Sequence, residues 1–116
     1  MNLTGKVLLI MALILPVHLP GVSSLQVDFC KIYGSVYVEK NPRYADYRVY
    51  VEDSESFCDV IVFQSENRLF ADAPGLWHFT SKKGFEDFSI CFEKERGLAD
   101  FTIFITQTES FAGCNR

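Results

Sequence analysis

Five aspartates recur at nearly constant spacing and are the first residues of this chain whose pattern could do chemistry. They are Asp46, Asp59, Asp72, Asp87 and Asp100, separated by 13, 13, 15 and 13 residues. One carboxylate per repeat could form a ring that binds calcium, but calcium needs about 6–8 oxygen atoms converging on one point. A carboxylate that follows a small residue also accepts backbone N–H groups in a tight turn. We therefore interpret the five aspartates as structural turn caps and expect no metal ion or other cofactor.

The second feature that could take part in chemistry is His78, which lies beside Trp77, the only tryptophan. This histidine could act as a general base, with Ser81 or Asp72 nearby in the sequence. A lone histidine between Trp77 and Phe79 is more often a packed or half-exposed ring of a strand. The sequence also lacks the common hydrolase, phosphate-loop and metalloprotease motifs. We expect no catalytic residue and no enzyme activity; the alternative is a small secreted hydrolase centred on His78.

The N-terminal segment has the three-part layout of a secretory signal peptide. Residues 1–6 carry one positive charge, residues 7–15 form an unbroken apolar run, and residues 22–24 are small side chains before a plausible cleavage site. The apolar run is shorter than the roughly 20 residues that span a bilayer. We expect residues 1–24 to be removed and residues 25–116 to form a single secreted repeat domain without stable membrane insertion.

Charge narrows the class of partner. Removal of Lys6 lowers the number of Lys and Arg residues from 11 to 10 against 15 Asp and Glu residues, which gives a net charge of −5. The charges are interspersed and form no basic stripe, so the sequence predicts no binding to nucleic acid or to anionic membranes. The partner is unknown, and an extracellular protein or glycan is the kind of ligand that these exclusions leave open.

Four cysteines lie after the signal segment: Cys30, Cys58, Cys91 and Cys114. An even number of cysteines in an exported chain predicts two disulfides. Structural zinc sites usually draw their ligands from close pairs of cysteines, and no such pair occurs here. Spacing alone leaves three disulfide pairings open.

The elements that must position these residues follow the same 13-residue repeat. Val36-Tyr37-Val38 returns as Val49-Tyr50-Val51, and each aspartate precedes a run of β-branched and aromatic residues. No apolar stripe of helical period is present, so an all-β domain of about seven strand-turn repeats is predicted, with a short helical turn near residues 65–69. The expected strands are residues 34–38, 47–51, 60–64, 76–80, 88–92 and 101–105. One unit is irregular, because two extra residues and a Pro-Gly turn separate Asp72 from the strand that contains Trp77.

The pattern resembles the 7(1) septoil knot domain family. Members of that family repeat a strand and a turn ending in Ala-Asp, carry Gly-Leu-Trp near the middle and finish with Ala-Gly. The matching segments over residues 31–113 are Ala45-Asp46, Ala71-Asp72, Ala99-Asp100, Gly75-Leu76-Trp77 and Ala112-Gly113. Cys58-Asp59 and Glu86-Asp87 depart from the pattern at the alanine position. The resemblance implies a small toroidal, knotted domain and brings no established activity, catalytic residue or ligand.

The resemblance also implies a disulfide pairing. If seven equal units circle the ring twice, units three or four apart become neighbours. That arrangement implies the disulfides Cys30–Cys91 and Cys58–Cys114, which would staple the domain. The expected function is that of a secreted, non-catalytic module, either a rigid, protease-resistant scaffold or a binding protein, and a defence or toxin-like protein is a further alternative.

Overall fold

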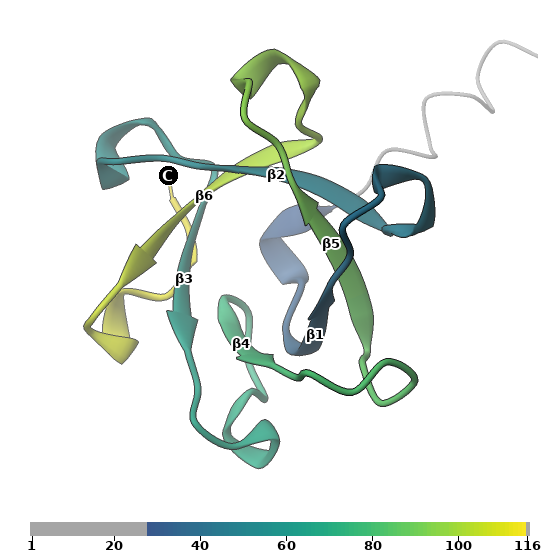
Figure 1. The fold of residues 1–116 in the computed structure, drawn as a ribbon. Helices are drawn as coiled ribbons and strands as arrows, with labels where there is room; N and C mark the ends of the chain where they lie inside the picture. The colour runs from purple at the N-terminus through teal and green to yellow at the C-terminus, as the bar shows by residue number, and fades with distance from the viewer. Residues whose placement is uncertain (1–27, 116) are drawn as a thin grey trace, which may run out of the picture.

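A computed structural model describes residues 28–115 (Figure 1). The expected signal peptide, residues 1–24, and its cleavage site lie outside the described residues. Between residues 28 and 115, no helix is long and apolar enough to cross a membrane.

Strands and short 3-10 helices alternate along the described chain. The strands are β1 (Gly34–Val38), β2 (Tyr47–Val51), β3 (Val60–Gln64), β4 (Leu76–Phe79), β5 (Phe88–Phe92), β6 (Phe101–Thr106) and β7 (Gly113–Cys114). The 3-10 helices are η1 (Phe29–Lys31), η2 (Pro42–Tyr44), η3 (Glu55–Phe57), η4 (Arg68–Phe70), η5 (Arg96–Leu98) and η6 (Glu109–Phe111). The expected strands are confirmed to within one residue at their ends. The helical turn expected near residues 65–69 is η4, and it proves to be one copy of a recurrent element.

Six parallel strands close into a ring. The sheet order is β4-β1-β5-β2-β6-β3-β7, and β4 also pairs with β3, which closes the circle. The two-residue β7 pairs with β3 in the antiparallel direction. Figure 1 shows the strands arranged around a centre, with the turns projecting outward from the ring. The predicted all-β repeat architecture is confirmed.

Short connections explain why most strands do not pair with their sequence neighbours. Consecutive parallel strands need a connection of about a dozen residues. The segment between β1 and β2, residues 39–46, has only eight residues, so β1 pairs instead with β4 and β5. The one consecutive pair is β3–β4, whose connection, residues 65–75, is the longest within residues 28–115.

Apolar side chains at alternate strand positions fill the inside of the ring. Val60 and Val62 of β3 are fully buried, as is Trp77 of β4. The Trp77 ring lies 5.1 Å from that of Phe88, measured between centroids in an edge-to-face contact. Phe29 of η1 packs against this core, so the N-terminal helix contributes to it. These large rings give a small domain much buried apolar area per residue.

Candidate functional site

Four of the five repeated aspartates link neighbouring strands through pairs of hydrogen bonds. The backbone N–H of Asp59 donates to the carbonyl oxygen of Thr102 at 3.0 Å, and the backbone N–H of Thr102 donates to Oδ2 of Asp59 at 2.9 Å. The same pair of bonds joins Asp46 to Ser89, Asp87 to Ser35 and Asp100 to Arg48. Each carboxylate therefore extends the main-chain pairing of two parallel strands by one bond. We call these contacts aspartate bridges.

The bridges correct the interpretation of the aspartates as caps of their own turns. The residues they bind are 43 or 52 positions away in the sequence. The 3-10 helices η1 to η4 are capped instead by side chains that precede them by one position, such as Asn41, whose Oδ1 accepts the backbone N–H of Arg43 at 2.9 Å. Free N–H groups lie at the start of a 3-10 helix, and all of the repeated aspartates except Asp87 follow the end of one. Asp72 accepts no hydrogen bond from residues 28–115, and within that range no group of three His, Cys, Asp or Glu side chains is arranged to hold a metal ion.

A basic side chain forms an ion pair with an acidic one at the end of β1. Lys83 Nζ lies 2.8 Å from Oε2 of Glu39, whose side chain is 9% exposed. The same ammonium group lies 5.9 Å from the ring centre of Tyr37 and 5.7 Å from that of Tyr44. The hydrogen bond to Glu39 raises the pKa of Lys83 above its ordinary value. We call this set of four residues the first clamp.

A second clamp closes the end of β2 in the same way. Arg96 Nη2 lies 2.7 Å from Oε1 of Glu52, and the guanidinium lies 5.8 Å from the ring centre of Tyr50. The other carboxylate oxygen of Glu52 is buried without a hydrogen-bond partner among residues 28–115. Breaking this clamp would therefore leave a largely desolvated carboxylate without its counter-charge.

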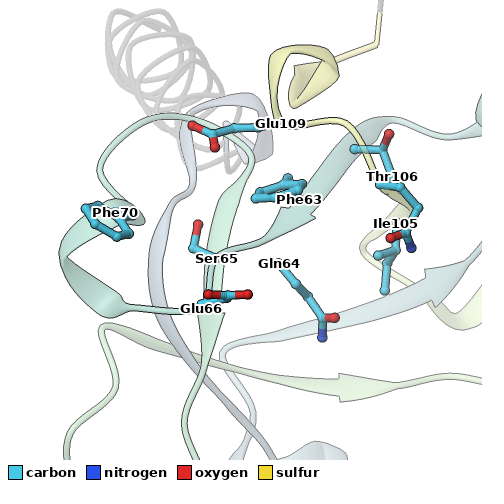
Figure 2. Close-up of a pocket in the computed structure, with 9 residues that line it drawn as sticks. Phe63, Gln64, Ser65, Glu66, Phe70, Ile105, Thr106 and Glu109 are labelled. Carbon is cyan, nitrogen blue, oxygen red and sulfur yellow. The ribbon is translucent and has the colours of Figure 1, made fainter.

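The end of β3 is hollow. A cavity of about 410 Å³ lies between β3, the end of β6, η4 and η6. The residues that line it are Phe63, Gln64, Ser65, Glu66, Phe70, Ile105, Thr106, Gln107 and Glu109. Figure 2 shows the Phe63 and Phe70 rings on either side of Ser65, with the carboxylates of Glu109 and Glu66 above and below it in this view. We call this cavity the β3 hollow.

His78 borders a second hollow, which shares Gln64, Ser65 and Glu66 with the first. Its Nδ1 lies 2.9 Å from the carbonyl oxygen of Ser65, so the ring contacts the backbone just after β3. Neither Ser81 nor Asp72 hydrogen-bonds to this ring in the described part of the chain. Trp77, in contrast, is fully buried, and its Nε1 donates to the carbonyl oxygen of Ile32 at 3.2 Å. The two adjacent residues thus have separate roles, Trp77 in the core and His78 at the surface between β4 and β3.

The closed strand ring and its aspartate bridges occupy one continuous stretch of the chain, and a family model covers the same stretch. The model described as the 7(1) septoil knot domain matches residues 29–115. The chain belongs to the 7(1) septoil knot domain family. Comparisons with curated proteins and with solved structures found no match. Membership confirms the resemblance found in the sequence and assigns no activity.

The septoil knot domain is stapled by a disulfide between Cys30 and Cys114, with an S–S distance of 2.03 Å. The expected pairs Cys30–Cys91 and Cys58–Cys114 are wrong. They assumed seven equal parallel units, whereas β7 has two residues and runs antiparallel to β3. The reversed strand packs against η1, which carries Cys30. Cys58 and Cys91 are free and buried.

Burial makes the two free thiols of the septoil knot domain poor nucleophiles. Desolvation raises the pKa of both Cys58 and Cys91 above the ordinary thiol value. Because the thiolate is the reactive form, these cysteines pack as small apolar side chains.

Sequence reasoning missed both clamps of this septoil knot domain, although part of the signal was present. Tyr37 and Tyr50, Glu39 and Glu52, and Lys83 and Arg96 are each 13 residues apart, like the aspartates. The acid and the base of one clamp are separated by 44 residues, however. That offset becomes meaningful only when the order of strands around the ring is known.

Proposed function

We propose that this septoil knot domain is a secreted, non-catalytic binding module whose rigid ring resists proteolysis. The observation that carries the proposal is the set of links between segments that are distant in the sequence. Aspartate bridges join strand to strand, and Cys30–Cys114 links segments 84 residues apart near the two ends of the described chain. A protease needs a locally opened segment. A ring whose successive strands are linked by hydrogen bonds and a disulfide offers few such segments.

Secretion is supported by two independent features. Residues 1–24 have the composition of a signal peptide, and a structural disulfide suits an oxidising compartment. The buried free thiols are compatible with that setting because they are shielded from oxidants.

A binding role is supported by large apolar side chains exposed at the same position of successive turns. Each of these residues ends a 3-10 helix and precedes the small residue before the repeated aspartate position: Tyr44, Phe57, Phe70, Leu98 and Phe111. Exposed aromatic side chains are common where proteins contact a partner, because they offer a large rigid surface. The partner we propose is an extracellular protein or glycan.

The alternative, a hydrolase centred on His78, finds less support. The Nδ1 atom of His78 is engaged with a backbone carbonyl oxygen, and Ser81 is exposed without a hydrogen bond to that ring. A hydrolytic site would require a nucleophile within hydrogen-bond reach of the base.

The test is expression of the full chain in secretory cells, followed by mass spectrometry and limited proteolysis. We expect the medium to contain residues 25–116 with one disulfide and two thiols. The native protein should survive proteinase K at least about tenfold longer than the same protein after reduction of its disulfide, because reduction raises the population of opened chains. Retention inside the cells with residues 1–24 attached would contradict secretion, and equal half-lives of the native and reduced protein would contradict the rigid ring.

A further inference from the structure

The ends of β1, β2 and β3 carry the same four positions, each shifted by 13 residues. The first set is Tyr37, Glu39, Tyr44 and Lys83; the second is Tyr50, Glu52, Phe57 and Arg96; the third is Phe63, Ser65, Phe70 and Glu109. The first two sets contain the two clamps. The third set lines the β3 hollow.

In the first two sets, a cation of the chain itself occupies the space between acid and rings. Lys83 reaches Glu39 at 2.8 Å and lies over Tyr37 and Tyr44. Arg96 reaches Glu52 at 2.7 Å and lies over Tyr50. A cation held over aromatic faces and paired with a carboxylate is stabilised by both contacts.

In the third set, the rings persist, the acid is replaced by a neutral residue and the cation is replaced by an acid. Ser65 stands where the first two sets have a glutamate, and Glu109 stands where they have the cation. Glu109 is the first residue of η6, as Arg96 is of η5, so the turn presents the same position with the opposite charge. No Lys or Arg is among the residues that line the cavity of about 410 Å³.

The β3 hollow therefore combines two aromatic rings, Phe63 and Phe70, with two carboxylates, Glu66 and Glu109 (Figure 2). These groups suit an organic cation, and the acidic chain favours its approach. We propose that the β3 hollow binds a Lys or Arg side chain of a partner protein, in the place that Lys83 and Arg96 fill within their own clamps. This inference deepens the proposed binding role and rests on it for the partner being a protein.

The direct test is an NMR titration of the uniformly ¹⁵N-labelled protein. The expressed full chain is used as the cells produce it, with residues 1–24 attached or removed. The probes are the tripeptides acetyl-Gly-Arg-Gly-amide and acetyl-Gly-Lys-Gly-amide, and acetyl-Gly-Gln-Gly-amide is the neutral control. We expect saturable shifts of the backbone amides of Ser65, Phe70 and Glu109 with a basic peptide and none with the control. The absence of saturable shifts with both basic peptides, or equal shifts with the neutral one, overturns the proposal.

Two single substitutions locate the charge that matters. Glu109→Gln should weaken binding of the basic peptide by about fivefold, the range expected for one exposed ion pair. Glu55→Gln is the matched control, since Glu55 begins η3 as Glu109 begins η6 but lies outside the hollow. Unchanged binding by Glu109→Gln, or an equal loss in Glu55→Gln, overturns the assignment.

A double substitution tests the equivalence of the three sets by supplying the acid and the cation that the third set lacks. Ser65→Glu combined with Glu109→Lys should rebuild an internal clamp, so that peptide binding is lost while the double variant melts at a higher temperature than either single variant. Wild-type peptide binding by a folded double variant overturns the proposal. Failure of peptide binding in these experiments leaves secretion and protease resistance standing, because those are measured without any ligand.

Discussion

The ring has two sides that use the same repeat differently. On the regular side, formed by β1, β5, β2 and β6, each neighbouring pair of strands is joined by an aspartate bridge. On the irregular side, formed by β3, β4 and β7, Asp72 makes no bridge and Gly113 replaces the aspartate of the last unit. Three hollows border the irregular side, two around Ser65 and one between Ala73 and Ala112, and one borders the regular side, beside Pro42 and Cys91.

The difference shows how one repeat can provide both stability and a surface for binding. Repeated polar contacts close the regular side, where the two clamps also lie. The irregular side is closed by the Cys30–Cys114 disulfide and by a close backbone contact at Gly75, which leaves its side chains freer to differ from the repeat. The candidate binding residues lie on the side where the sequence departs from the repeat.

The largest expected effect is the loss of the disulfide. Replacing both Cys30 and Cys114 with Ser should lower the free energy of unfolding by about 4 kcal/mol, because the bond closes a loop with a sequence separation of 84 residues. Urea unfolding measures the loss. Cys91→Ala, a buried thiol on the regular side, is the control and should cost about 1 kcal/mol. A loss below about 1 kcal/mol in the double variant would mean that other contacts close the irregular side.

The second effect separates two glycines that both have a positive φ. An added Cβ at Gly75, where φ is +84°, would clash with the backbone of Gly113 and lie 2.8 Å from the carbonyl oxygen of Ile61. At Gly84, where φ is +105°, an added Cβ would meet nothing within 4 Å. Gly84→Ala should therefore cost about 1 kcal/mol of backbone strain, and Gly75→Ala about 3 kcal/mol or more, because the packed backbone must also shift. Similar unfolding midpoints for the two variants would refute the close contact.

The third effect compares an aspartate that forms a bridge with one that does not. Asp59→Ala should lower the free energy of unfolding by about 2 kcal/mol, because the N–H of Thr102 loses its acceptor. Asp72→Ala should change it by less than about 0.5 kcal/mol. Asp59→Asn should recover part of the loss, since the amide oxygen can still accept the bond. Equal losses at positions 59 and 72 in chemical denaturation would remove the distinction between an aspartate that forms a bridge and one that does not.

The smallest effect is pH-dependent and belongs to the first clamp. The pKa of Lys83 is raised above its ordinary value of 10.5, so its pairing with Glu39 contributes fully below pH 10.5. That contribution is lost as the pH rises through the raised value. The stability difference between the wild type and Lys83→Met should therefore be constant near neutral pH and shrink above pH 10.5. The difference is the quantity to measure, because ionisation of Cys58 and Cys91 affects both proteins above pH 9.0. A constant difference up to pH 12 would indicate that Lys83 acts through packing alone.

Local features of the fold could be predicted from the sequence because they depend on residues close together. Val49 and Val51 mark their strand by alternation and β-propensity, and the same pattern marks the other strands. The 13-residue spacing and the segments around Ala45 and Trp77 were enough to identify the family.

The contacts between strands that are distant in the sequence could not be predicted in the same way. The antiparallel direction of β7 decides the partner of Cys114, and no local propensity records it. The partner of Asp59 lies 43 residues away, so its role as a bridge depends on the order of strands around the ring. The β3 hollow depends on both kinds of information. Its residues occupy repeat positions, but it is open because Ser65 replaces the acid and Glu109 replaces the cation of the other two sets.

The pairing of strands three or four units apart also constrains how the chain can fold as it is synthesised. Among the first three strands none pairs with another, because β1 pairs with β4 and β5 while β2 pairs with β5 and β6. A nascent chain that ends before Leu76 therefore has no two strands of this ring that can form a ladder. Nearly all sheet contacts are distant in sequence, which slows folding. We expect the ring to form late, after most of the chain has left the ribosome. Until then, the polar connections between the β-rich segments must keep these unpaired segments from associating with one another.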